Sequence, residues 1–177
     1  MATTQDRVPS GIGGDGVHES RVSVREALPS DLGTIADLEG RSFSNPWHPD
    51  TFRSLLKRDR VRVFVAEDPE EGVLGYSVVW WVLDQAELAN LAVDGDHHGR
   101  GIGSALLDRV IAHVEAQGVE TLFLEVRMSN NKATRLYGSR GFTEISIRKS
   151  YYQNPREDAR ILVKHLGNTC SQFQKMR

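Results

Sequence analysis

Residues 91–110, LAVDGDHHGRGIGSALLDRV, join an apolar run to an apolar-periodic helix through a glycine-rich turn. The turn holds three glycines, Gly99, Gly101 and Gly103, and residues without a side chain let the backbone approach a ligand or another part of the chain closely. At such a junction the unpaired N–H groups of the first helical turn and the positive end of the helix dipole converge on one point. The stretch therefore predicts a strand–turn–helix unit whose turn binds a phosphate or packs tightly under the helix.

The apolar patterning of the remaining chain predicts strands and helices in an order that narrows the fold class. Strand-like runs cover 22–28, 61–67, 73–84, 86–93, 121–126, 143–152 and 158–166, and helix-like runs cover 29–43, 45–58, 102–118 and 129–142. The polar residues 153–157, QNPRE, form a predicted loop between the last two strands. This order predicts a mixed α/β (α+β) sheet with helices on both faces, not an alternating doubly wound fold.

The composition fits one globular domain and excludes several classes of partner. The chain has 177 residues, of which 39% are hydrophobic and 26% charged, and its net charge at pH 7 is −2. This balance gives no electrostatic basis for binding nucleic acid or an anionic membrane, and no apolar stretch is long enough to span a bilayer. We expect residues 1–20 to be a flexible leader, 21–166 the folded domain and 167–177 a flexible tail.

The compartment is predicted from the first residues and the cysteine content. The start, MATTQDRVPSGIGGDG, lacks the basic and apolar segments of a signal peptide. The single cysteine, Cys170, excludes an internal disulfide framework and lies in the polar tail. We therefore expect a protein of the reducing cytoplasm, in which Cys170 is an incidental thiol and not a nucleophile.

Two well-known phosphate motifs do not describe the glycine-rich turn. The P-loop requires a Gly-Lys pair, and the turn contains none. The dinucleotide fingerprint G-x-G-x-x-G is matched by Gly99 and Gly101 but fails at Ser104, and no ribose-binding acid follows in a β-α-β pattern.

A third motif fits better. The hexapeptide 98–103, HGRGIG, resembles the [QR]-x-x-G-x-[GA] loop of the Gcn5-related N-acetyltransferases (GNAT), which cradles the pyrophosphate of acetyl-coenzyme A after a strand ending like LAV. His98 departs from the usual Gln or Arg, and because backbone amides do most of the holding, we expect binding to survive. The cofactor-binding residues that the resemblance implies are Leu91, Ala92, Val93, Gly99, Arg100, Gly101, Ile102, Gly103, Ser104 and Asn130.

A second segment strengthens this resemblance. Residues 124–142, LEVRMSNNKATRLYGSRGF, are similar to the family run E-V-R-x-x-N-x-x-A-x-x-L-Y-x-x-x-G-F. With NPW at 45–47 and IRKSYYQNPREDARIL at 147–162, the chain most resembles the RimI-type enzymes, which acetylate the N-terminal alanine of a small-subunit ribosomal protein. The resemblance implies a mostly antiparallel central sheet of about seven strands, acetyl-CoA as cosubstrate and a protein N-terminus as partner.

Glu125 and Tyr137 match the family's general base and general acid. Glu125 is an acid inside an otherwise apolar strand, and such a carboxylate is costly to bury unless it is paired or hydrated. A salt bridge to Arg127 or another cation is the alternative, compatible with a base that acts through water. Tyr137 either donates a proton to the coenzyme A thiolate or anchors its helix, and both roles are compatible in one amphipathic ring.

Three further side chains are candidates for binding. Asn130 either contacts the coenzyme or caps the helix that follows. Tyr151 and Tyr152 end a strand before a loop, where they would suit a peptide N-terminus. Strand alternation predicts that these two tyrosines face opposite sides of the sheet, so that one packs and one binds substrate.

Metal binding is not expected from this chain. His97 and His98 are adjacent in a turn, but no Cys, Asp or Glu lies at ligand spacing to complete a site with them. Asp94 and Asp96 are near in sequence, which does not make a coordination shell.

The leading hypothesis is direct acetyl transfer to a protein N-terminal amine in a ternary complex without an acyl-enzyme. Acetylation of a small-molecule amine and a broad-specificity N-terminal acetyltransferase are alternatives within the enzymes. A coenzyme A-binding module without catalysis is the alternative outside them. The preferred N-terminus and the oligomeric state are left open by the sequence.

Overall fold

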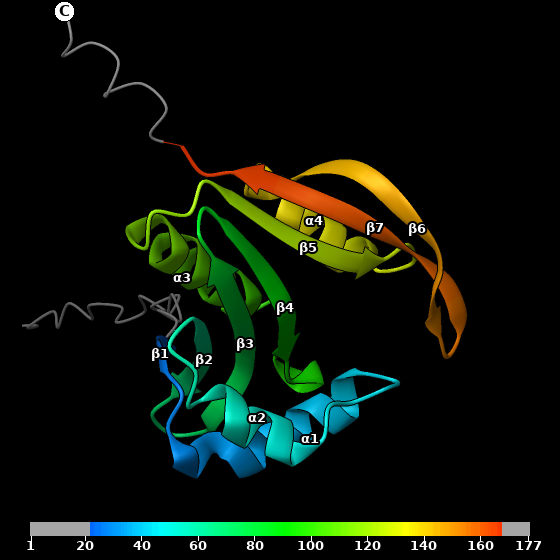
Figure 1. Ribbon diagram of the computed structural model, residues 1–177. Coiled ribbons are helices and arrows are strands. Elements are labelled where there is room, and N and C mark those ends of the chain that lie inside the picture. The colour runs from blue at the N-terminus through cyan, green and yellow to red at the C-terminus, as the bar shows by residue number, and fades with distance from the viewer. Residues whose placement is uncertain (1–21, 168–177) are drawn as a thin grey trace, which may run out of the picture.

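The computed structural model describes residues 22–167, which form one sheet with helices on both sides (Figure 1). The predicted leader, Cys170 and all of the predicted tail except Gly167 lie outside the described residues. The elements are β1 (Ser23–Glu26), η1 (Pro29–Asp31), α1 (Leu32–Ser42), α2 (Pro49–Leu55), β2 (Val61–Asp68), β3 (Gly72–Val82), β4 (Gln85–Val93), η2 (Gly95–His97), α3 (Ile102–Ala116), β5 (Thr121–Arg127), α4 (Asn131–Ser139), β6 (Thr143–Gln153) and β7 (Arg156–His165).

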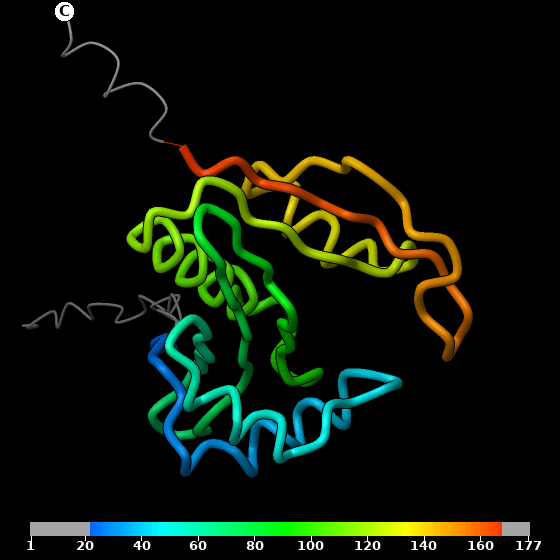
Figure 2. The backbone as a smooth tube through the Cα atoms, in the orientation of Figure 1, coloured from blue at the N-terminus to red at the C-terminus, as the bar shows by residue number. Residues whose placement is uncertain are grey.

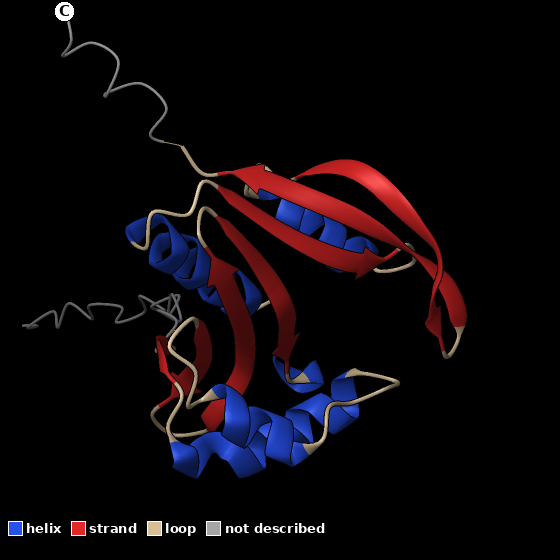
Figure 3. Cartoon of the chain, in the orientation of Figure 1, coloured by secondary structure: helices blue, strands red, loops and turns tan. Residues whose placement is uncertain are grey.

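The seven strands form one sheet in the order β1-β2-β3-β4-β5-β7-β6, in which only the β4–β5 pair is parallel. The predicted mixed, mostly antiparallel sheet is therefore confirmed (Figure 3). The predicted polar loop 153–157 is shorter than expected, because Gln153 still belongs to β6 and Arg156 already belongs to β7. No helix in residues 22–167 is both long and apolar enough to cross a membrane.

Each face of the sheet has its own apolar core, as the predicted helices on both faces require. The apolar stripe of α3 packs on one face with Tyr137 of α4, and Leu106, Leu107, Val110 and Val114 are fully buried there. The opposite face is covered by α1 and α2, whose Ile35, Leu38 and Phe52 pack against β2 and β3. The helices thus hold the centre of the sheet from both sides.

The sheet opens between β4 and β5. These strands pair only from Gln85↔Thr121 to Leu88↔Leu124, and beyond this point they diverge (Figure 2). The opening begins at a bulge in β4, where Val79 faces Leu88 but Val78 faces Asn90, so that Ala89 is the extra residue. The fold therefore presents two unpaired strand edges to one V-shaped gap.

Candidate active site

The glycine-rich turn lies at the end of β4 and starts α3. Gly99 and Gly101 have φ angles of +84° and +80°, a backbone conformation that favours glycine. Gly101 is the N-cap of α3 without a side-chain cap, and the first helical hydrogen bond runs from the Ala105 N–H to the Gly101 carbonyl at 3.0 Å. The amides of Ile102, Gly103 and Ser104 precede that bond, so they have no partner within the helix, and their binding of an anion stays a prediction.

Gly103 has a different role from its two neighbours. A Cβ atom placed on Gly103 would lie 3.4 Å from Leu136 Cδ2 and 3.7 Å from Val93 Cγ2. The third glycine therefore lets the first turn of α3 lie close to both α4 and β4. The interpretation of tight packing under the helix is confirmed at Gly103, and phosphate binding by the turn stays a prediction.

The charged side chains of this turn are directed at the protein itself. Arg100 Nη1 donates to Glu71 Oε1 at 2.9 Å, and His97 Nε2 lies 2.6 Å from Glu71 Oε2. The hydrogen bond to Glu71 raises the pKa of His97 above its usual value. His98 Nε2 lies 3.1 Å from the Val93 carbonyl oxygen. Within residues 22–167, no group of three or more His, Cys, Asp or Glu side chains is arranged to hold a metal.

The open edge of β4 is formed by alternate residues. Ala92 pairs with Tyr76, and the Asp94 N–H donates to the Leu74 carbonyl of β3 at 2.8 Å. Because backbone groups alternate along an antiparallel strand, Leu91 and Val93 turn their N–H and C=O groups toward the gap. The predicted open edge therefore consists of Leu91 and Val93, while the backbone of Ala92 is used within the sheet.

Glu125 is the first residue of β5 beyond the last β4–β5 pair, so its side chain stands where the sheet divides. The side chain is 19% exposed and its Oε1 lies 2.5 Å from Arg148 Nη1. A hydrogen bond from the Tyr151 hydroxyl to this carboxylate raises the pKa of Tyr151 to about 12. The predicted salt bridge of Glu125 to Arg127 or another cation is confirmed for another cation, Arg148 of β6, whereas Arg127 binds Glu157 at 3.3 Å.

Tyr137 and Asn130 both belong to α4 and its start. Tyr137 is buried, and its ring lies 5.7 Å from that of Phe142, so its predicted anchoring role is confirmed. Burial raises the pKa of Tyr137, which keeps the phenol protonated at neutral pH. Asn130 Oδ1 accepts the Ala133 N–H at 3.1 Å, so the capping role of Asn130 is confirmed, and its contact with the coenzyme stays a prediction.

Tyr151 and Tyr152 lie on the same side, and the prediction of opposite faces is wrong. Their rings meet edge to face at 5.1 Å between centroids. Regular alternation fails because the β6–β7 register shifts between Arg148 and Tyr152, and Ser150 has a φ of +52°. The irregularity directs both rings toward Glu125, which accepts a hydrogen bond from Tyr151. Burial, together with the charge of Glu125, raises the pKa of Tyr152.

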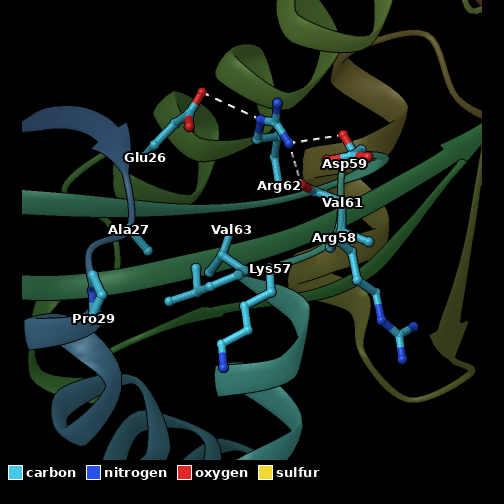
Figure 4. Close-up of a pocket in the computed structure, with 10 residues that line it drawn as sticks. Glu26, Ala27, Pro29, Lys57, Arg58, Asp59, Val61, Arg62 and Val63 are labelled. Atoms are coloured by element: carbon cyan, nitrogen blue, oxygen red, sulfur yellow. Dashed lines mark hydrogen bonds and ion pairs between the residues drawn. The ribbon is translucent and has the colours of Figure 1, made fainter.

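Sequence reasoning missed Arg148 and the contacts of Arg127. Arg148 stands three residues before Tyr151 in a run of alternating polar residues, and only the fold shows that it faces Glu125. A separate hollow of about 400 Å³ lies beside β1, β2 and the residues after α2, where Glu26, Lys57, Arg58 and Arg62 line it (Figure 4). None of the predicted site residues lines this hollow, and β3 and β4 separate β2 from β5 in the sheet.

Comparisons with known proteins agree with this arrangement. The sequence profile described as "Acetyltransferase (GNAT) family" matches residues 32–142. The chain is 38% identical over 136 residues to the [ribosomal protein bS18]-alanine N-acetyltransferase of Escherichia coli K12, covering 76% of this chain and 90% of that protein. It is 29% identical over 144 residues to a putative enzyme of the same name from Bacillus subtilis, covering 81% and 95%.

Solved structures show the same relationship. The crystal structure of the ribosomal-protein-S18-alanine N-acetyltransferase from Escherichia coli superposes with a TM-score of 0.77 at 35% identity, covering 85% of this chain and 97% of that one. The Ard1 structure from Thermoplasma volcanium shares the fold, with a TM-score of 0.76 at 23% identity, covering 83% and 99%. The divided sheet, the glycine-rich turn and these matches lead to one conclusion: the chain belongs to the GNAT family of acetyltransferases.

Proposed function

We propose that this protein transfers an acetyl group from acetyl-CoA to the α-amine of a protein, namely the N-terminal alanine of a small-subunit ribosomal protein. The names of the bacterial relatives that match at 38% identity support this substrate. The observation that carries the proposal is the position of Glu125 at the division of the sheet, next to the β4 edge and hydrogen-bonded to Tyr151.

The residues around the gap fit acetyl-CoA as the cosubstrate. The free amides at the start of α3 suit the pyrophosphate, because unpaired N–H groups and the helix dipole both favour an anion. The outward N–H and C=O of Leu91 and the N–H of Val93 suit the amides of the pantetheine arm, which would pair as a further strand does, whereas the Val93 carbonyl already contacts His98 Nε2 at 3.1 Å. Acetyl-CoA supplies the thioester, and the backbone N–H groups at this edge are the natural donors to the oxyanion that develops on its carbonyl.

Glu125 would act on the incoming amine. A protein α-amine has a pKa of about 8, so much of it is protonated near neutral pH and needs a base. Arg148 and the Tyr151 hydroxyl hold the Glu125 carboxylate in one orientation, from which it takes the amine proton directly or through a water. Tyr137 keeps its proton because it is buried, and in the proposed reaction it gives that proton to the departing thiolate.

The test is release of coenzyme A with a panel of amines. The panel holds peptides beginning with alanine, serine and Met-Leu, a peptide with a blocked N-terminus and an internal lysine, and spermidine. Turnover confined to the alanine peptide supports the proposal, and turnover with several free N-termini indicates a broad N-terminal acetyltransferase. Turnover only with spermidine or the blocked peptide refutes the substrate class, and binding of acetyl-CoA without turnover indicates a non-catalytic module.

A further inference from the structure

We propose that Arg127, which lies two residues after Glu125 in β5, is a positioning residue that fastens two loops together and so sets the affinity for the peptide substrate. The two loops are residues 43–48 between α1 and α2, and the Asn154–Pro155 turn between β6 and β7. The effect on the peptide rests on the proposed function above, whereas the fastening itself is a property of the fold.

The guanidinium of Arg127 uses both terminal nitrogens twice. Nη2 donates to Ser44 Oγ at 2.8 Å and to the Asn154 carbonyl at 3.0 Å. Nη1 donates to the Pro155 carbonyl and to Glu157 Oε2, both at 3.3 Å. Because these acceptors match a planar fork with fixed donor directions, a lysine ammonium, which is a single point of charge, cannot reproduce the set.

The loop at 43–48 is linked to the far half of the sheet through Arg127. Its other end is held from the α1 side, where Glu39 Oε1 accepts the Trp47 N–H at 2.8 Å and the Trp47 ring stacks on Trp80 at 6.2 Å. Both contacts are made with the half of the fold that ends at β4, since Glu39 lies in α1 and Trp80 in β3. The Ser44–Arg127 bond therefore spans from the α1–α2 loop to β5, the strand on the other side of the gap.

Arg127 also supports the tyrosines assigned to the substrate. Its guanidinium carbon lies 4.0 Å from the ring centroid of Tyr152, a cation–π distance. The Tyr152 ring lies against Tyr151, whose hydroxyl binds Glu125. Arg127 reaches the proposed base through the rings of Tyr152 and Tyr151, and so it acts through the walls of the site.

The experiment compares Arg127→Lys with Ser44→Ala and a matched control. Arg25→Lys makes the same chemical change in the edge strand β1, where the Arg25 fork binds Asp31 and Glu67. For Arg127→Lys we expect the KM for the alanine peptide to rise about tenfold while the KM for acetyl-CoA stays within about twofold of wild type. For Ser44→Ala, which removes one of the contacts, the peptide KM should rise about two- to threefold.

Arg25→Lys should lower the melting temperature without moving either KM, which separates local positioning from general stability. Equal KM values in Arg127→Lys and wild type would overturn the proposal. The proposal would also be overturned if both KM values, for the peptide and for acetyl-CoA, rose in parallel in Arg127→Lys and rose equally in Arg25→Lys. Partial recovery of the peptide KM in Arg127→Ala on addition of free guanidinium would support it, because the added ion replaces the missing fork.

Hydrogen exchange tests, without any substrate, whether Arg127 holds the two loops together. A failure of this proposal can therefore be distinguished from a failure of the proposed function. In Arg127→Lys we expect amides of 43–48 to exchange at least about threefold faster than in wild type, with Arg25→Lys unchanged there. Unchanged exchange in this loop would overturn the proposal even if the peptide is a substrate. Faster exchange with no turnover of the peptide by wild type would uphold the fastening and refute the substrate.

Discussion

Replacing the buried Glu39 of α1 with alanine removes one carboxylate that serves three parts of the fold. Glu39 is 1% exposed. Its Oε1 accepts the Trp47 N–H at 2.8 Å, its Oε2 accepts from Asn90 Nδ2 at 3.0 Å, and the Tyr76 hydroxyl also donates to Oε2. The donors come from the α1–α2 loop, from β4 beside its bulge and from β3.

The magnitude follows from the donors left behind. The Tyr76 hydroxyl is buried, and a buried donor without a partner costs about 1–3 kcal/mol. The Trp47 N–H and the Asn90 amide are only partly buried and cost less each, so we predict a total loss of roughly 2–5 kcal/mol. That is a large share of the ~5–15 kcal/mol that holds a typical domain together. Tyr76→Phe removes one of the donors and leaves Glu39 with the other two, so we expect it to lower the free energy of unfolding by about 1 kcal/mol.

The assay is urea unfolding at pH 7, followed by circular dichroism, with the free energy of unfolding obtained from midpoint and slope. Glu67→Ala is the control, because Glu67 is an exposed partner of Arg25 and a surface ion pair is worth about 0–1 kcal/mol. If Glu39→Ala lowers the free energy of unfolding by no more than Glu67→Ala does, the argument that Glu39 satisfies buried donors is refuted.

Other predictions concern pH and catalysis. Burial, followed by the charge of Arg62, lowers the pKa of His113, so the unfolded chain binds its proton more readily. The free energy of unfolding should therefore fall as the pH drops below about 6.5. In His113→Gln the melting temperature should depend less on pH than in wild type. The same pH dependence in both proteins would contradict this. Glu125→Gln should lower kcat by about 10²–10⁴-fold at pH 7 with little change in melting temperature, and wild-type kcat would refute the base role. Gly101→Ala should raise the KM for acetyl-CoA, because a φ of +80° costs a residue with a Cβ about 1–2 kcal/mol; isothermal titration showing unchanged affinity would contradict it.

The order of strands and helices was predictable because each depends on local periodicity. The stripe of α3 and the alternation of β5, in which Leu122, Leu124 and Val126 are buried, follow directly from side-chain spacing. The glycines at 99 and 101 were predictable as turn residues, since a positive φ favours glycine for steric reasons alone.

The contacts around Glu125 were not predictable, because they depend on irregular strand geometry. The register shift near Tyr152 and the left-handed Ser150 bring Tyr151 and Tyr152 to one side, against simple alternation. Arg127 and Glu125 share a face of β5 as expected, yet each finds its partner on a different neighbouring segment. Pairing of this kind depends on tertiary neighbours that spacing along one strand does not specify.

The central claim is that an acetyl group passes to the α-amine of a protein beginning with alanine, at the site around Glu125. The most direct measurement is tandem mass spectrometry of an alanine-initiated peptide that also contains lysine, after incubation with acetyl-CoA and either wild type or Glu125→Gln. We expect acetyl on the N-terminal fragment only, formed by wild type and strongly reduced in the variant. Acetyl on the lysine side chain, or equal modification by both enzymes, would contradict it.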